Sequence, residues 1–297
     1  MKFKLLVDRL AGSFMWILVL VSVLLLIVIG LGLYIKSIPI LEENTLQSLL
    51  FSSSWSPMKG EFGFLPFLMG TLWVTVIAIV LALPVALLTA IFLTEYAKPV
   101  IKKYFFPALD ILAALPSVIY GVWGTLLIVP FIADRLSPHF VEFSTGYSAL
   151  AGGIVLGIMI LPLLVSLMIE IFSAVSVDYR EASWSLGATK WQTIKRVLLL
   201  KTSPGILAAV VLAISRAFGE TIAVLMVCGN MPIMPQSIFD SCYPIPALIA
   251  NNYGEMLSLP LYESALMFAA LILFVVVFLF NVLSRMVLYR IEKKFNI

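Results

Sequence analysis

Charged side chains are scarce in this sequence: 12% of its 297 residues are Asp, Glu, Lys or Arg, whereas 62% are hydrophobic. Soluble domains carry about a quarter charged residues. A chain with this composition and a mean hydropathy of +1.11 cannot cover its surface with polar groups in water, so it uses lipid as part of its solvent. The composition excludes a soluble globular protein and predicts an all-α polytopic membrane protein.

Residues that hold metals or perform catalysis are also few. One histidine (His139) and two cysteines (Cys228 and Cys242) cannot assemble a zinc site, although a disulfide between the cysteines stays open. No Ser/His or paired-aspartate arrangement lies in the apolar runs, which argues against an intramembrane enzyme. No Gly-x-x-x-x-Gly-Lys-Ser/Thr loop is present to bind nucleotide phosphates. We expect no cofactor and no catalytic residue, and any ATP hydrolysis must belong to a partner.

Six apolar runs are long enough to cross a bilayer as helices, which takes about 18 residues or more. The first run, residues 14–35, is longer than the apolar core of a signal peptide and ends in Tyr34-Ile35-Lys36, so we interpret it as a retained anchor helix. The runs are 14–35, 67–94, 105–133, 147–172, 204–228 and 264–284.

Lysine and arginine lie mostly on one side of these runs. Of the 19 basic residues, 15 fall in the N-terminus, the joint at 98–103, the stretch 180–201 and the C-terminus. By the positive-inside rule these segments are cytoplasmic, so both termini are predicted to be cytoplasmic. We divide the chain into an anchor helix and outer joint (1–66), a core that holds the other five spans (67–285) with a cytoplasmic loop at about 173–203, and a basic cytoplasmic tail (286–297).

Proline, glycine and aromatic residues predict further local features of the spans and joints. Leu115-Pro116-Ser117 predicts a break in the third run, because proline removes a hydrogen bond and clashes with the preceding turn. This break either lines a cavity or serves packing. Gly153 and Gly157 have the small-residue spacing of close helix packing. The two long outer joints, 36–66 and 229–260, carry aromatic residues expected at the headgroup level or against a soluble partner: Trp55, Phe62, Phe64, Tyr243 and Tyr253.

The stretch 177–203 is the most polar part of the chain. Asp178 and Glu181 have capping-box spacing, which predicts a helix over 179–186 with Gly187 as its terminus. Thr189 and Gln192 repeat the pattern and start a second helix. We expect a helix-turn-helix that docks on a cytoplasmic partner, or else lies on the membrane surface. The second helix has four apolar residues at helical spacing on one face: Trp191, Ile194, Val197 and Leu198.

This stretch resembles the loop by which permeases of ATP-binding-cassette importers insert a coupling helix into their ATPase subunits. The resemblance departs from the family where Leu200 takes the place of a proline, with Pro204 following. It implies the type I importer permease fold. The positions that it assigns to coupling are Asp178, Tyr179, Arg180, Glu181, Ala182, Ser183, Gly187, Ala188 and Trp191.

An arginine and a glutamate lie inside the fifth run. Arg216 comes twelve residues after Pro204, about 18 Å along a helix and near mid-membrane, so it should face an interior or an aqueous path. Glu220 is four residues on, within pairing reach on the same face. Guanidinium binds tetrahedral oxyanions through two parallel hydrogen bonds, which suits phosphate or sulfate. The alternative is a buried ion pair that only fixes packing. Thr221 and Ser117 are further candidates for the path.

The sequence Arg216-Ala217-Phe218-Gly219-Glu220-Thr221-Ile222-Ala223-Val224 resembles phosphate-importer permeases of the PstC type. Leu115 to Gly121 and Gly70-Thr71-Leu72 fit the same group. The resemblance implies an ATP-driven phosphate importer of the bacterial cytoplasmic membrane that works by alternating access. It implies four partners besides lipid and no nucleic acid: a second permease (PstA type), two ATPase copies (PstB type) and an external phosphate-binding protein (PstS type). A sulfate or molybdate importer and an ion-driven transporter are the alternatives.

Overall fold

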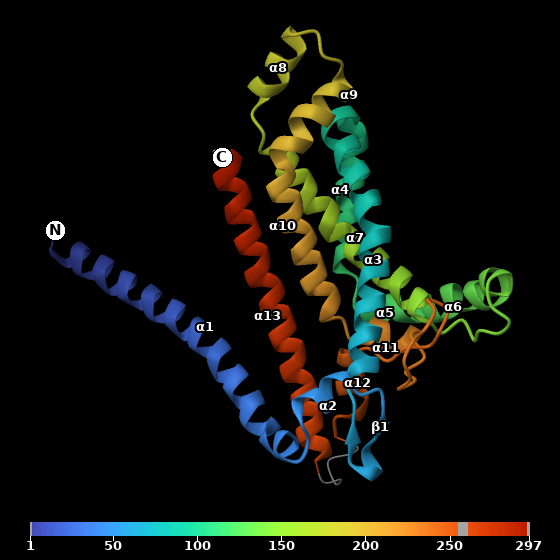
Figure 1. The fold of residues 1–297 in the computed structure, drawn as a ribbon. Coiled ribbons are helices and arrows are strands. Elements are labelled where there is room, and N and C mark those ends of the chain that lie inside the picture. Colours follow the sequence, from blue (N-terminus) through green and yellow to red (C-terminus); the bar gives the residue numbers. More distant parts are fainter. Residues whose placement is uncertain (1, 255–260, 296–297) are drawn as a thin grey trace.

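The computed structural model describes residues 2–254 and 261–295, and this part of the chain is almost entirely helical. Six of its helices are long and apolar enough to cross a membrane, which confirms the predicted number of spans. Figure 1 shows them as a bundle with short helices at both ends. The spans are Leu10–Glu43, Leu65–Tyr96, Ser117–His139, Ala149–Ser173, Lys190–Phe218 and Tyr262–Leu283.

The first span lies mostly outside the bundle. Helix α1 (Lys2–Glu43) leans away from the other helices in Figure 1 and meets α13 (Tyr262–Phe295) near its C-terminal end. Almost every side chain between Leu10 and Ile29 is exposed in the single chain. Because α1 is apolar all round, lipid or another membrane subunit must cover it.

The tightest helix pair is α3 (Leu65–Ile91) with α7 (Ala149–Ser173). A Cβ atom on Gly153 would lie 2.4 Å from Ile77 Cγ2, and one on Gly157 would lie 3.2 Å from the Ala78 carbonyl oxygen. These contacts confirm the predicted small-residue packing, which lets two backbones approach closely without polar side chains. The matching face of α3 is a ladder of buried small residues at every fourth position: Val74, Ala78, Ala82, Ala86 and Ala90.

The third apolar run is broken where Pro116 predicts it. Helix α4 (Pro99–Ala114) ends before the proline, α5 (Ser117–Trp123) begins after it, and the Tyr120 hydroxyl donates to the Leu112 carbonyl across the break at 2.7 Å. The expectation of one run over 105–133 is therefore wrong, because the third span begins only at Ser117. The span continues through short helical segments: η3 (Gly124–Ile128), α6 (Val129–Phe131), η4 (Ile132–Leu136) and η5 (Ser137–His139). His139 is exposed there, as expected.

The fifth span is shifted toward the N-terminus relative to the predicted run 204–228. It begins at Lys190 and ends with α10 (Leu199–Phe218), and α11 (Ile222–Val227) is a separate short helix. The polar backbone turn Gly219-Glu220-Thr221 separates the two helices. In Figure 1, α10 stops part-way along α13, so the turn lies within the bundle.

The two outer joints contain short helices and strands of their own. After α2 (Leu46–Phe51), strands β1 (Trp55–Ser56) and β2 (Glu61–Phe62) form an antiparallel hairpin around η1 (Pro57–Lys59), and α12 (Ile245–Asn252) belongs to the second joint. Phe62, Phe64 and Tyr243 are buried and Trp55 is half-buried, so the expectation of surface aromatics is wrong for them; Tyr253 is exposed. Edge-on contacts, and one tilted contact between Phe67 and Tyr243, join the members of an aromatic cluster: Trp55, Phe62, Phe64, Phe67, Tyr243 and Tyr262.

Cys228 and Cys242 are both buried and carry free thiols, so the disulfide left open by the sequence is not formed. Their backbones are paired, since the Cys242 amide donates to the Cys228 carbonyl at 2.9 Å. The three-part division of the chain and the cytoplasmic placement of both termini remain predictions. The last helix runs on to Phe295, whereas residues 255–260 of the second joint and 296–297 of the tail lie outside the described residues.

Candidate coupling site and anion path

The polar stretch forms a short helix at one end of the molecule. Helix α8 (Val177–Ser185) starts two residues earlier than predicted, because Ser176 caps it and Asp178 does not. The Ser176 hydroxyl accepts from the Asp178 amide at 3.3 Å and donates to the Asp178 carboxylate at 2.7 Å. A serine one position before an apolar residue and two before an aspartate is an ordinary helix start, which the Asp178–Glu181 interpretation missed.

The turn after α8 follows the prediction. Gly187 has φ +78°, and its amide donates to the Trp184 carbonyl while the Ala188 amide donates to the Ser183 carbonyl. This is a left-handed helix terminus that favours glycine. The predicted capping box is present: the Thr189 hydroxyl accepts from the Gln192 amide and the Gln192 side chain accepts from the Thr189 amide.

The helix that follows does not present four apolar residues on one face. Between α9 (Lys190–Thr193) and α10 lies one wider turn, the π-helical segment η6 (Ile194–Leu198). Ile194 and Leu198 are buried, Val197 is half-buried and Trp191 is exposed. The expectation is wrong for Trp191, because a π turn adds a residue and rotates the preceding side chains away from the face below it.

The tip of this hairpin is apolar and exposed. Helix α8 has no buried side chain, and Leu186 at its end is 89% exposed. Figure 1 shows α8 and α9 projecting from the bundle at the end opposite β1. Asp178, Glu181, Ala182 and Gly187 are also exposed, whereas Ser183 is half-buried and bonds to Thr193 through their hydroxyls at 2.9 Å. The exposed large apolar side chains are Val177, Tyr179, Trp184, Leu186 and Trp191.

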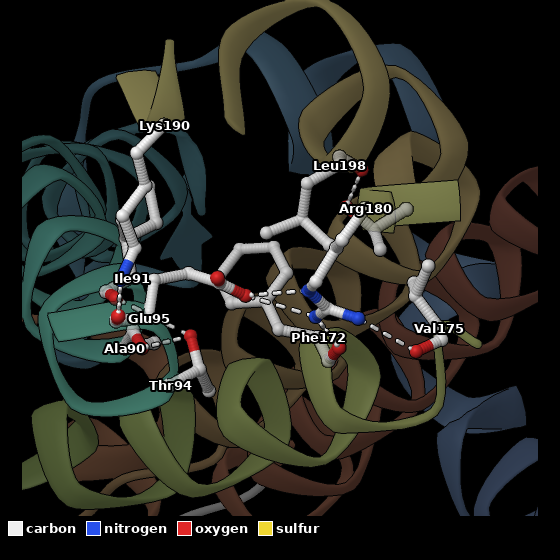
Figure 2. Close-up of polar contacts among 10 residues, drawn as sticks. Ala90, Ile91, Thr94, Glu95, Phe172, Val175, Arg180, Lys190 and Leu198 are labelled. Atoms are coloured by element: carbon white, nitrogen blue, oxygen red, sulfur yellow. Dashed lines mark hydrogen bonds and ion pairs between the residues drawn. The ribbon is translucent and has the colours of Figure 1, made fainter. Parts of the chain in front are cut away.

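Arg180 points inward, unlike its neighbours on α8. Its Nε and Nη2 atoms donate to Glu95 Oε1 at 3.0 and 2.8 Å. Nη1 donates to the Val175 carbonyl at 2.8 Å and Nη2 to the Phe172 carbonyl at 3.1 Å, at the C-terminal end of α7. The Arg180 and Glu95 side chains are only 13% and 8% exposed. Figure 2 shows this guanidinium held between the carboxylate and the two carbonyls.

Glu95 belongs to η2 (Phe92–Tyr96), a π-helical turn that ends the second span. Lys190 binds there too: its ammonium donates to the Glu95 carbonyl and lies 4.6 Å from the centre of the Tyr96 ring. Sequence reasoning missed Glu95 and Lys190. The signal available in the sequence was Glu95 itself, an isolated acid at the end of the second apolar run. It lies on the same predicted side of the membrane as the loop that carries Arg180.

Arg216 and Glu220 are not paired. Arg216 is exposed in the last turn of α10, and Glu220 lies beyond the end of that helix, so the expected i to i+4 alignment is wrong. Glu220 Oε1 accepts from the Ala223 amide at 3.3 Å and so caps α11. Within residues 2–254 and 261–295 the salt bridges are Lys36–Glu263 and Arg180–Glu95. The packing ion pair that competed with an anion path is therefore not formed.

Ser117 and Thr221 begin two helices that pack together, and both are half-buried. A Cβ on Gly121 would lie 3.2 Å from Ala223 Cα, and one on Gly124 would lie 2.9 Å from Val227 Cγ1. Contacts that advance in the same direction along both chains mean that α5 and α11 run parallel. Their first residues therefore lie at the same end of the pair, near the turn that carries Glu220.

The hairpin formed by α8 and α9 (177–193) is called the coupling hairpin below. A cavity lies away from it. The loops around 143–147 and 229–241 line an open cavity of about 490 Å³. Exposed apolar side chains, Phe143 and Met231, stand at this cavity beside the Asp240 carboxylate, which accepts from the Gln236 and Ser237 amides at 2.8 Å. The cavity lies in the joints predicted to be external.

Residues 82–296 match the family described as "Binding-protein-dependent transport system inner membrane component". The match covers most of the chain, including every element of the coupling hairpin. The chain belongs to this family. Members are transport subunits rather than enzymes, and a permease of this kind works with other permease, ATP-binding and substrate-binding subunits.

Individual relatives align over most of this permease. It is 40% identical over 238 residues to "Probable ABC transporter permease protein YqgH" of Bacillus subtilis, covering 80% of this chain and 75% of that protein. It is 34% identical over 261 residues to "Phosphate transport system permease protein PstC" of Pasteurella multocida, covering 83% and 81%. A probable PstC protein of Methanocaldococcus jannaschii is 33% identical, covering 88% of each chain.

Solved structures support the fold of the permease. A chain of the MetNI methionine ABC transporter in an inward-facing conformation superposes with a TM-score of 0.57, covering 77% of this chain and 94% of that one. At 18% sequence identity the likeness establishes the fold alone. The predicted six-helix importer permease fold is thereby confirmed.

Proposed function

We propose that this permease carries inorganic phosphate through the bacterial cytoplasmic membrane as a subunit of an ATP-driven importer. The observation that carries the substrate is the set of relatives named as phosphate transport permeases, which are 33–35% identical to this chain over more than four-fifths of its length. The exposed Arg216 at the end of α10 supplies a chemistry that suits such an anion.

Arg216 needs a polar environment that this chain alone does not provide. It lies inside the fifth span, and an arginine facing lipid at the helix centre costs about 2.5–3.5 kcal/mol on insertion scales. Ser215, its neighbour in sequence, accepts a hydrogen bond from the Asn281 side-chain amide at 3.1 Å, which is a polar contact between α10 and α13. Arg216 therefore faces a path between this subunit and a second permease, of the PstA type.

The turn that carries Glu220 and Thr221 lies next to this arginine in sequence, and Ser117 begins the helix packed beside it. A carboxylate there can accept a hydrogen bond from a protonated phosphate oxygen, whereas fully ionised sulfate has no such proton. The four residues Arg216, Glu220, Thr221 and Ser117 form the anion path in this proposal. Arg216 holds the anion, and the other three surround it at a helix break.

The coupling hairpin supplies the connection to ATP. We assign its exposed apolar residues, Leu186 foremost, to docking on a pair of ATP-binding subunits of the PstB type. An external phosphate-binding protein of the PstS type delivers the anion at the opposite end, where the loops line the open cavity beside Phe143 and Met231. Closure of the ATP-binding pair opens the path outward, and hydrolysis returns it inward, which is alternating access.

Labelled phosphate uptake by the reconstituted complex tests this function, with ATP hydrolysis measured in the same vesicles. Arg216→Gln should abolish uptake while the complex still assembles and hydrolyses ATP, because only the anion contact is lost. Arg196→Gln is the matched control, since Arg196 is an exposed arginine at the other end of the same span. Unchanged phosphate uptake by Arg216→Gln removes this residue from the path.

Competition by unlabelled anions separates the alternatives. Excess sulfate or molybdate that suppresses uptake more strongly than excess phosphate assigns the permease to another oxyanion. Uptake that continues without ATP, or that vanadate does not inhibit, contradicts the ATP-driven function and favours an ion-driven transporter.

A further inference from the structure

The two helices of the coupling hairpin are attached to the bundle differently. Helix α9 begins the fifth span, and α8 is tied to that span by the Ser183–Thr193 hydroxyl pair at 2.9 Å and by the Lys201 ammonium, 5.0 Å from the centre of the Tyr179 ring. Helix α8 buries none of its residues, and only residues 174–176 connect it to the end of α7. The Ser183 and Tyr179 contacts reach the fifth span only, so a movement of α8 needs a further contact to act directly on the second and fourth spans. The structure provides one such contact in Arg180.

We propose that Arg180 and Glu95 form the mechanical link that transmits movement between the coupling helix and the second and fourth spans. This inference rests on the proposed docking of α8 on the ATP-binding subunits. Arg180 uses its guanidinium on three groups from two spans: the Glu95 carboxylate at the end of the α3 span and the Phe172 and Val175 carbonyls at the end of α7. Arg180 and Glu95 are positioning residues, because neither contacts nucleotide or transported anion.

The geometry of the link makes it stiff. Two hydrogen bonds to one carboxylate oxygen and two to carbonyls leave the guanidinium no alternative orientation, and a planar guanidinium keeps its donors in fixed directions. The pair is nearly excluded from water, where ion pairs are screened little. Its carbonyl partners stand at the C-terminus of α7, where the helix dipole favours a cation.

The spans that receive the link are those most tightly packed together. Helices α3 and α7 meet along the alanine ladder and Gly153, so they move as one body. Two segments next to the hairpin are π turns: η2, which carries Glu95, and η6, which follows α9. Single π turns inside helices are frequent at functional sites. The η2 turn brings Glu95 to the end of its span and the Lys190 ammonium binds the carbonyl of the same residue. Figure 2 shows Arg180 and Lys190 reaching Glu95 from the two arms of the hairpin.

A double-mutant cycle in the complete reconstituted complex tests the link, with Glu95→Gln, Arg180→Gln and the two combined. Three quantities are measured: co-purification of the ATP-binding subunit, stimulation of ATP hydrolysis by phosphate-loaded binding protein, and phosphate taken up per ATP hydrolysed. We expect assembly and basal hydrolysis within twofold of the unchanged complex, stimulation reduced to near basal, and uptake per ATP reduced at least tenfold. The double variant should be no worse than either single one, because all three break the same contact. Glu95→Asp, which keeps the carboxylate, should recover part of the coupling.

The control breaks the other salt bridge, Lys36–Glu263, through Lys36→Gln. That pair is largely exposed and lies at the opposite end of the molecule, so coupling should be unchanged. Normal stimulation and normal uptake per ATP in both single variants overturn the link. Loss of assembly in Glu95→Gln and in Glu95→Asp also overturns it, since the pair would then only place the docking surface. If Leu186→Asp does not weaken assembly, docking by α8 itself fails, whatever the cycle shows.

Discussion

At the scale of single residues, backbone proximity decides which positions tolerate change. Gly153 illustrates this, because a Cβ there would lie 2.4 and 2.5 Å from two atoms of Ile77 on α3. The neighbour is a β-branched side chain on a rigid helix, with no free end that could move aside. Such a glycine is a packing residue, in contrast to Gly187, whose role is conformational.

Gly153→Ala should therefore destabilise the permease by about 1–3 kcal/mol, the usual cost of overpacking a tight core. Gly12→Ala is the matched control: Gly12 is also helical and has no atom within 4 Å of its added Cβ. Thermal unfolding of the two variants in the same detergent checks this. Equal midpoints would show that α3 and α7 can separate without cost.

At the scale of elements, the coupling hairpin depends on its turn and on its exposed tip. Gly187 has φ +78°, a conformation that costs an L-residue roughly 1–2 kcal/mol. The hairpin is otherwise held by the Thr189–Gln192 capping box and by Arg180. Changes at Gly187 act on the shape of the hairpin, whereas changes at Leu186 act on its surface.

Leu186→Asp should weaken association with the ATP-binding subunit at least tenfold, because a charge replaces the most exposed apolar side chain at the tip. Ser185→Asp, next to it and also exposed, is the control and should change association less than twofold. Co-purification at several subunit concentrations measures both. Equal binding of the two variants would contradict docking by the tip.

Gly187→Ala tests the turn without altering the surface. We expect coupled uptake to fall several-fold while Gly187→Asn retains more of it, since asparagine tolerates a left-handed conformation better than alanine. Uptake per ATP hydrolysed is the measurement. The reverse order of the two variants would mean that the turn is not left-handed in the working complex.

At the scale of the whole molecule, the distribution of basic residues predicts how the chain is oriented in the membrane. Cys228 and Cys242 are fully buried, so a single introduced cysteine can report sidedness with little background. Met58 and Leu186 stand at opposite ends of the bundle and are both highly exposed. They are therefore suited to a topology measurement.

An impermeant maleimide added to intact cells should label Met58→Cys and leave Leu186→Cys unlabelled until the membrane is opened. The reason is that the segment 180–201 carries five basic residues and is predicted to be cytoplasmic, whereas the joint 36–66 carries only Lys36 and Lys59. Labelling of Leu186→Cys in intact cells would invert the orientation and with it the proposed side of ATP binding.

Much of the fold could be predicted from the sequence because membranes impose strong local rules. Length and hydropathy determined six spans, Pro116 determined the break before Ser117, and Thr189 with Gln192 determined the start of α9. Gly187 marked the end of the first helix of the hairpin, where the structure has a left-handed residue. Each of these depends on residues only a few positions apart.

Only the tertiary structure decided which distant groups meet. The helix ending at Phe218 separates Arg216 from Glu220, the π turn in η6 exposes Trp191, and the end of the second span places Glu95 against Arg180. None of these follows from local spacing, because helix ends and π turns arise from packing against other spans. The sequence by itself determined a six-helix permease with a polar hairpin, since hydrophobicity and capping are local. The structure alone decided how that hairpin is held, since an ion pair between residues 95 and 180 exists only when the spans have packed.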